Sequence, residues 1–149
     1  MYLSQNFTLD EFIRSSTADR LGIDNNPEQF ILPNLRRTAE GMEQVRSLLG
    51  NHPIRITSGF RSPELNNAVG SKSTSQHTRG LACDFLCPDY GLPEDIVHAI
   101  VKSKIEYDQC IFERMTRPGG INSWVHVSFT EKGRKQALVI DDKGTRAWA

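Results

Sequence analysis

The sequence is poor in cysteine. Three residues of this type occur among 149, at Cys83, Cys87 and Cys110. An odd number without a recognisable framework spacing excludes a disulfide-stabilised scaffold. The gap between Cys83 and Cys87 is not the two-residue spacing of a zinc knuckle, and all three cysteines lie in or beside apolar runs. We therefore expect buried free thiols rather than metal ligands.

An excess of charge of one sign is also missing, and so is a long apolar run. Eighteen basic residues balance eighteen acidic ones, so no net field attracts the chain to nucleic acid. No stretch approaches the roughly 20 apolar residues of a membrane-spanning helix. Residues 1–6 lack the basic and apolar regions of a signal peptide. We expect synthesis in the cytoplasm, so that any action outside requires another route of delivery.

The remaining composition is that of an ordinary folded chain. Hydrophobic residues make up 38% of the sequence, and no linker, repeat or low-complexity segment interrupts it. Residues 1–149 are therefore expected to form one domain. A capping box of Thr8 and Glu11 begins a predicted helix that ends after Leu21, at Gly22. Apolar residues spaced by three and four predict a second helix over 33–49.

Alternating and short apolar runs dominate the second part of the chain. They predict strands at 54–57, 81–87, 107–113 and 123–129, with an edge strand at 137–141 and helical segments at 64–68 and 93–104. Helices early and antiparallel strands later indicate an α+β fold, with one antiparallel sheet and helices packed on one side of it.

Three side chains in this region form a possible metal-ligand set. His77 lies in the loop before one predicted strand, Asp84 within that strand and His126 within a later one. Strand alternation places Asp84 and His126 on the more polar faces of their strands, so the three could meet on one sheet surface. Two imidazoles and a carboxylate suit zinc and leave a fourth position open. A packed histidine and a turn-capping aspartate are the alternative. His52 and His98 fit no such pattern, and we expect both to be structural.

Three sequence patterns together resemble the zinc D-alanyl-D-alanine carboxypeptidase family. They are Ser-Gly-Phe-Arg-Ser at 58–62, Ser-x-His-x-x-Gly-x-Ala-x-Asp at 75–84 and Trp-Val-His-Val-Ser at 124–128. The similarity begins at residues 7–12 and is strongest to the short branch found in phages and prophages, which includes endolysins. It implies a DD-peptidase-like or hedgehog-like fold and a bound Zn²⁺. It also implies hydrolysis of an amide bond in peptidoglycan stem peptides, as a carboxypeptidase or endopeptidase.

The same resemblance implies roles for individual residues. His77, Asp84 and His126 match the metal ligands of the family. Arg61 matches an arginine that acts on a carbonyl or carboxylate group of the substrate. A guanidinium beside the metal would stabilise the oxyanion that forms as the amide is attacked. A salt bridge at the end of a strand is the other interpretation of Arg61.

The general base is a separate question. Several members of the family have an acidic residue three positions before the last histidine, where this chain has Ser123. A hydroxyl cannot replace the carboxylate in this role. Glu113, at the end of a predicted strand, is the best substitute if that strand is a neighbour of 123–129. Asp108 is a weaker candidate, and a surface salt bridge is the alternative for Glu113.

Four further residues are candidates for contact with substrate. Ser75, Gln76 and Ser128 flank the predicted ligands and could either touch the substrate or support the ligands. Trp124 could form a wall of the cleft or fill the core.

The sequence is also compatible with two other functions. The protein could be a peptidoglycan-binding module that has lost catalysis, since Ser123 replaces the usual acid. It could also be a structural part of a phage particle, such as a tail or baseplate component.

The expected partner is a peptidoglycan peptide, with no nucleic acid and no membrane segment, and a monomer is the simplest expectation. The enzyme would reach the wall after release from the cell or as part of a phage particle.

Overall fold

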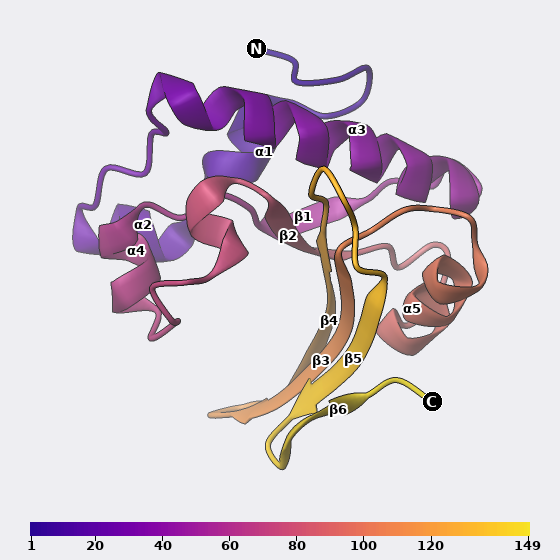
Figure 1. Ribbon diagram of the computed structural model, residues 1–149. Helices are drawn as coiled ribbons and strands as arrows, with labels where there is room; N and C mark the ends of the chain where they lie inside the picture. Colours follow the sequence, from indigo (N-terminus) through magenta and orange to yellow (C-terminus); the bar gives the residue numbers. More distant parts are fainter.

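A six-stranded sheet and five α-helices make up the computed structural model, which describes residues 1–149 (Figure 1). The sheet has the order β1-β2-β4-β3-β5-β6. The helices are α1 Leu9–Ile13, α2 Ser16–Leu21, α3 Leu32–Leu48, α4 Pro63–Ala68 and α5 Pro93–Lys102, with 3-10 helices η1 Gln29–Ile31 and η2 Gln76–Arg79. The strands are β1 Arg55–Ser58, β2 Ala82–Leu86, β3 Gln109–Arg117, β4 Gly120–Ser128, β5 Gln136–Asp141 and β6 Gly144–Ala147.

The predicted α+β class is confirmed, but the sheet is mixed rather than purely antiparallel. Strands β3 and β5 pair in parallel, and every other neighbouring pair is antiparallel. The short connection from β4 to β5 crosses the start of β3. There Lys135 N–H donates to the Tyr107 carbonyl, and Gln136 N–H donates to the Asp108 carbonyl. Strand β5 therefore begins beside the start of β3 and runs in the same direction.

The strand at 137–141 was predicted to lie at the edge of the sheet, and this prediction is wrong. It corresponds to β5, which lies between β3 and β6. The edge strand β6 was not predicted, because its four residues are all exposed and show no alternation of apolar and polar side chains.

The predicted helix between Thr8 and Leu21 is broken in two. Arg14 has extended backbone angles, and the Ser15 side chain then accepts a hydrogen bond from the Ala18 N–H at 3.1 Å, which begins α2. The capping box at the start and Gly22 at the end are both present as predicted. An N-cap serine inside the pattern therefore restarts the helix.

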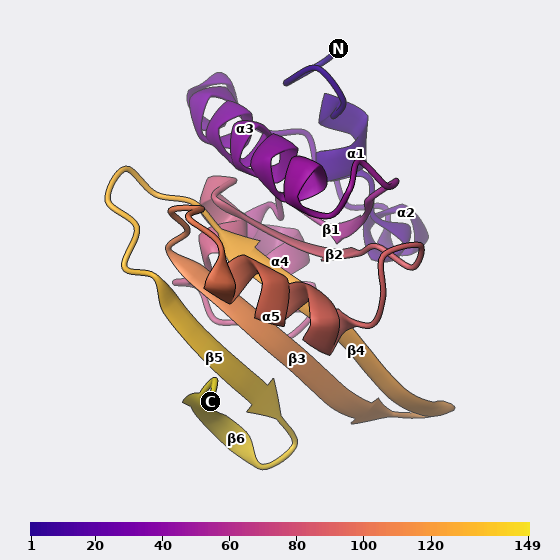
Figure 2. The same ribbon diagram turned by 90° about the vertical axis from the view of Figure 1, so that its right-hand side faces the viewer.

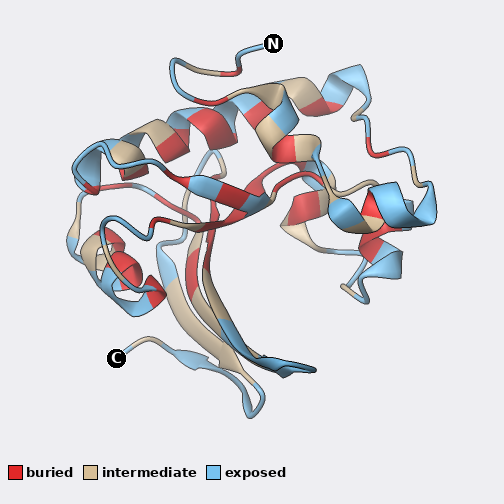
Figure 3. Ribbon diagram, turned by 180° about the vertical axis from the view of Figure 1, so that it is seen from behind, coloured by how far each residue is buried: buried red, intermediate tan, exposed pale blue.

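One face of the sheet is covered by α3 and α5. Their apolar residues join those of β2 and β4 in a core cluster of 24 buried residues. Helix α4 lies on the other side of β3 and β4 from α5 (Figures 1 and 2). The buried residues gather between the helices and the sheet, whereas the far end of the β3–β4 hairpin is exposed (Figure 3). The face opposite α5, which the short helix α4 leaves partly uncovered, therefore has room for a site.

The three cysteines are buried and free, as predicted. None of the helices combines the length and the apolar character that crossing a bilayer requires.

Candidate metal centre

Asp84 and His126 face each other across two neighbouring strands. They are direct partners in the antiparallel pairing of β2 with β4. His77 comes from η2, the turn just before β2, whose first residues are held by a hydrogen bond from the His77 N–H to the Ser75 hydroxyl at 3.2 Å. Gly80 ends the turn with a φ of 73°, a conformation that glycine adopts without strain. The turn therefore leads directly from His77 into the strand that presents Asp84.

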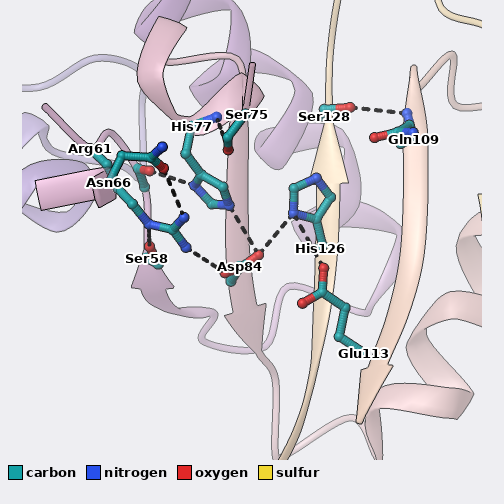
Figure 4. Close-up of polar contacts among 11 residues, drawn as sticks. Ser58, Arg61, Asn66, Ser75, His77, Asp84, Gln109, Glu113, His126 and Ser128 are labelled. Carbon is teal, nitrogen blue, oxygen red and sulfur yellow. Dashed lines mark hydrogen bonds and ion pairs between the residues drawn. The ribbon is translucent and has the colours of Figure 1, made fainter. Parts of the chain in front are cut away.

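The three predicted ligands form one compact, buried group. The carboxylate of Asp84 lies between the two imidazole rings (Figure 4). Its Oδ1 is 3.0 Å from His126 Nδ1 and 3.4 Å from His77 Nε2. One nitrogen or oxygen atom of each side chain lies within 4.8 Å of the others, and all three residues are buried. His52 and His98 are exposed and lie outside this group.

A backbone carbonyl fixes the orientation and tautomer of His77. Its Nδ1 is 2.7 Å from the carbonyl oxygen of Gly59. Because a carbonyl can only accept a hydrogen bond, Nδ1 carries the proton and Nε2 presents its lone pair toward Asp84. Histidine ligands of metals are commonly held in this way by an outer hydrogen bond. A Cβ atom at position 59 would overlap the Phe12 carbonyl, so only glycine permits this close approach.

The donor atoms fit a divalent metal ion. Bonds of roughly 2.0–2.1 Å in a tetrahedral site place neighbouring ligand atoms about 3.3 Å apart. The two distances to Asp84 Oδ1, 3.0 and 3.4 Å, are already close to this value. Two imidazoles and one carboxylate leave a coordination position open, as catalytic rather than structural sites do. This group could therefore hold a catalytic metal ion.

The charges of the group are also suited to a cation. Burial would raise the pKa of Asp84, but the two histidines outweigh it and hold this pKa well below the usual range. Burial lowers the pKa of His77 and keeps that ring neutral. The pKa of His126 is raised, because the hydrogen bond and charge of Asp84 outweigh the effect of burial. The group thus places one ionised carboxylate between two imidazole rings, a charge distribution that suits a bound cation.

Arg61 lies against the outer oxygen of Asp84. Its Nη2 is 3.6 Å from Asp84 Oδ2, its Nε donates to the Ser58 hydroxyl at 3.2 Å, and its Nη1 donates to Asn66 Oδ1 at 3.4 Å. Arg61 therefore forms an ion pair and also faces the ligand group, whereas its contact with a substrate stays a prediction. The sequence patterns assigned no role to Ser58 and Asn66, because these residues act by holding the guanidinium of Arg61 in place.

Glu113 is the acidic side chain nearest the ligand group. It is the direct partner of Trp124 across β3 and β4, and its Oε1 is 3.9 Å from His126 Nδ1. Burial and the charge of Asp84 raise its pKa to about 7, against the lowering effect of His126. Ser123 lines a separate cavity with Leu86 and residues 91–93. Glu113 on β3 therefore supplies the site with a carboxylate, whereas Ser123 on β4 does not face the site.

Asp108 is committed to other contacts. Its two carboxylate oxygens accept hydrogen bonds from Arg134 Nε at 2.9 Å and Arg134 Nη2 at 2.8 Å, and Gln76 Nε2 donates to it at 2.9 Å. The side chain is buried, and these contacts, chiefly those with Arg134, lower its pKa well below the usual range. It contacts neither histidine of the group.

The predicted substrate-contact residues differ in their positions. A cavity of about 500 Å³ opens beside the ligand group and is lined by Arg61, Ser75, Glu113 and Trp124, among others. Trp124 is a wall of this cavity, and the guanidinium of Arg117 lies 5.7 Å from its ring centre, a cation–π contact. Arg117 had no role in the sequence prediction.

Neither of the two remaining candidates lines this cavity. Gln76 lines a groove next to the cavity. Ser128 is fully buried, and its hydroxyl accepts a hydrogen bond from the Gln109 N–H at 3.0 Å.

An open metal-ligand group with a nearby carboxylate fits a metal-dependent hydrolase. The family model of peptidase M15 matches residues 5–128, which span both histidines, Asp84 and Glu113. The chain belongs to the peptidase M15 family, which confirms the resemblance seen in its sequence. A comparison with curated proteins found no match.

Proposed function

We propose that the protein is a zinc-dependent peptidoglycan hydrolase that cleaves an amide bond in stem peptides, as a carboxypeptidase or an endopeptidase. The observation that supports it best is the buried group of His77, Asp84 and His126, which opens to a cavity shared with Arg61 and Glu113. Membership of a peptidase family supports the reaction type. A phage or prophage origin, with delivery after cell lysis or on the phage particle, belongs to the same proposal.

The proposed zinc ligands are His77 Nε2, a carboxylate oxygen of Asp84 and His126 Nδ1. When bound, zinc supplies a Lewis acid that polarises a carbonyl group and makes water acidic enough to ionise near neutral pH. The hydrogen bond from His77 Nδ1 to the Gly59 carbonyl keeps the ligating nitrogen deprotonated.

The residues around the ligand group divide the remaining work. Glu113 accepts a proton from the attacking water at its carboxylate and later donates it to the leaving amine, which requires a pKa near the working pH. Arg61, held by Ser58 and Asn66, stabilises the negative charge that develops on the carbonyl oxygen. No side chain is needed as a covalent nucleophile.

Substrate contact is assigned to the lining of the cavity and of the groove next to it. Arg61, Ser75, Gln76 and Trp124 contact the peptide in this proposal, and Ser128 contributes indirectly by holding the start of β3 against β4. Residues 1–149 act as one catalytic domain and as a monomer.

Metal analysis combined with digestion of purified peptidoglycan tests the proposal. The protein is expected to bind about one zinc per chain, and mass spectrometry of the digest should show new amine and carboxyl ends in stem peptides. His77→Ala and His126→Ala should lose both the zinc and the cleavage, whereas His98→Ala, at an exposed position on α5, should keep both. Cleavage that survives loss of either ligand would contradict the mechanism. Binding to peptidoglycan without new amine ends would favour the binding module instead.

A further inference from the structure

A second groove adjoins the metal centre on the side of β5. It has a volume of about 630 Å³ and is lined in part by Glu113, His126, Ser71 and Ser75, which also line the cavity beside the ligand group. The two hollows therefore form one continuous path past the metal centre. A peptide bound with its scissile bond at the centre would extend into this groove on one side.

The floor of the groove is apolar. It is formed by Ile111 of β3 together with Leu138 and Ile140 of β5. The parallel register pairs Ile111 with Leu138 and Glu113 with Ile140. These side chains therefore lie on the same face of the sheet as Glu113, next to the place of reaction. Such a floor suits the aliphatic part of an amino-acid residue.

The rim of the groove is positively charged, although the whole chain has no net charge. Lys72, Arg79 and Arg134 line it, and Glu113, at the metal-centre end, is the acidic residue among the lining. Lys72 and Arg79 are exposed and take part in none of the ion pairs of the structure. The side chains of Lys72 and Arg79 are therefore free to bind a ligand.

The third charge is fixed in place. The guanidinium of Arg134 is held by two hydrogen bonds to Asp108, which is buried and is itself bound by Gln76. The side chain of Arg134 is nevertheless 58% exposed, so part of its donor fork faces solvent at the rim. A guanidinium fixed in this way needs little ordering when it binds an anion.

From this combination we propose that the groove is a specificity subsite for a carboxylate-bearing residue of the peptide, on the β5 side of the scissile bond. Its aliphatic part lies on Ile111, Leu138 and Ile140, and its carboxylate is bound by Lys72 and Arg79, with Arg134 beside them. No aromatic side chain lines the groove, so it lacks the stacking surface that nucleic acids use. This inference rests on the proposed function and adds to it the charge of the preferred substrate.

A pair of substrates that differ only in charge tests the inference. The probes are soluble muropeptides released by muramidase, and the same muropeptides with their carboxylates converted to amides by carbodiimide and ammonia. Calorimetric titration into the zinc-loaded Glu113→Gln protein measures binding without turnover, and hydrolysis of both probes is followed with the zinc-loaded wild type. We expect the acidic probe to bind about tenfold more tightly, as two partly screened charge pairs would give.

The double variant Lys72→Gln/Arg79→Gln should reduce this preference to less than about twofold in the titration. The matched control is Lys102→Gln/Lys104→Gln, which removes the same charge at exposed positions of and just after α5, on the opposite side of the sheet, and should keep the preference. Equal binding of both probes, a preference retained by the groove variant, or an equal loss in the control would each overturn the inference.

The experiment separates this inference from the proposed function. If the zinc-loaded wild type hydrolyses both probes at the same rate and binds them equally, the subsite is wrong and the hydrolase stands. If it hydrolyses neither probe but retains a charge preference that depends on Lys72 and Arg79, the groove does bind the carboxylate-bearing residue and the hydrolase is wrong.

Discussion

At the residue scale, the proposed chemistry depends on which carboxylate is free to move a proton. Asp84 lies between two imidazoles and the guanidinium of Arg61, and Asp108 is held by Arg134. Glu113 has only one ion-pair contact, with His126 at 3.9 Å, and its pKa is raised to about 7. A group with that pKa can both accept and donate a proton near neutral pH. Glu113 is therefore the carboxylate to which we assign proton transfer.

Glu113→Gln tests this assignment directly. Glutamine keeps the size of the side chain but cannot accept the proton, so kcat should fall by about 10²–10⁴-fold. The zinc content should stay at the wild-type level, because residue 113 is outside the ligand group. Hydrolysis rates and metal analysis on the same sample provide the measurement. A variant that keeps its turnover would move the base to another residue.

Arg61→Lys tests whether the guanidinium has a positioning role beyond its charge. Lysine keeps the charge but cannot reproduce the three contacts to Asp84, Ser58 and Asn66 at once. We expect kcat/KM to fall by about 10- to 100-fold, the effect of one misplaced oxyanion donor. Steady-state kinetics measures the effect, and Arg37→Lys, at an exposed position of α3, serves as the control. Unchanged kinetics would leave Arg61 with an electrostatic role alone.

At the element scale, the sequence predicted the local features better than the order of the strands. Alternation placed Asp84 and His126 on polar faces, and their strands are neighbours with these two residues as direct partners. The parallel pairing of β3 with β5 was not predictable in this way, because local patterns contain no information about which distant strand is adjacent. The outer hydrogen bond from His77 to Gly59 escaped prediction for the same reason.

The packing of helix α3 against the sheet explains why the helix contains a glycine at position 41. A Cβ at Gly41 would lie 2.5 Å from the ring of Phe129, which is buried after β4. Replacing glycine by alanine inside a helix raises the free energy of unfolding by about 1 kcal/mol. Overpacking a core lowers it, typically by about 1–3 kcal/mol. We expect Gly41→Ala to lower the free energy of unfolding by about 1 kcal/mol, measured by urea denaturation. A stabilised variant would show that α3 can move away from the sheet at little cost.

At the scale of the whole molecule, Asp108 connects three parts of the chain. Its carboxylate binds Gln76 of η2 and Arg134 of the β4–β5 connection, and its backbone N–H donates to the Ser128 carbonyl at the end of β4. These segments form the β5 side of the site, so the stability of the fold and the shape of the groove depend on the same buried group.

Asp108→Asn should therefore lower stability in a pH-dependent way. The folded-state pKa of Asp108 is depressed, so its contribution is present above the unfolded pKa of about 3.9 and is lost as the pH falls toward the folded value. At pH 7 the variant should be less stable by about 1–2 kcal/mol, since Arg134 is half exposed to screening. The difference should shrink below about pH 4 in parallel denaturant titrations. A difference independent of pH would assign the effect to packing.

Metal binding should also stabilise the whole fold, because the ligands come from η2, β2 and β4 and one ion would join all three. An ion present at 100 times its Kd adds about 2.7 kcal/mol to the free energy of unfolding. For a domain of this size that corresponds to a rise in Tm of about 5–10 °C. The rise should appear in calorimetry when zinc is added to chelator-treated protein, and should be absent in His126→Ala. An equal rise in that variant would mean that the ion binds elsewhere, because His126 supplies one of only three donors in the group.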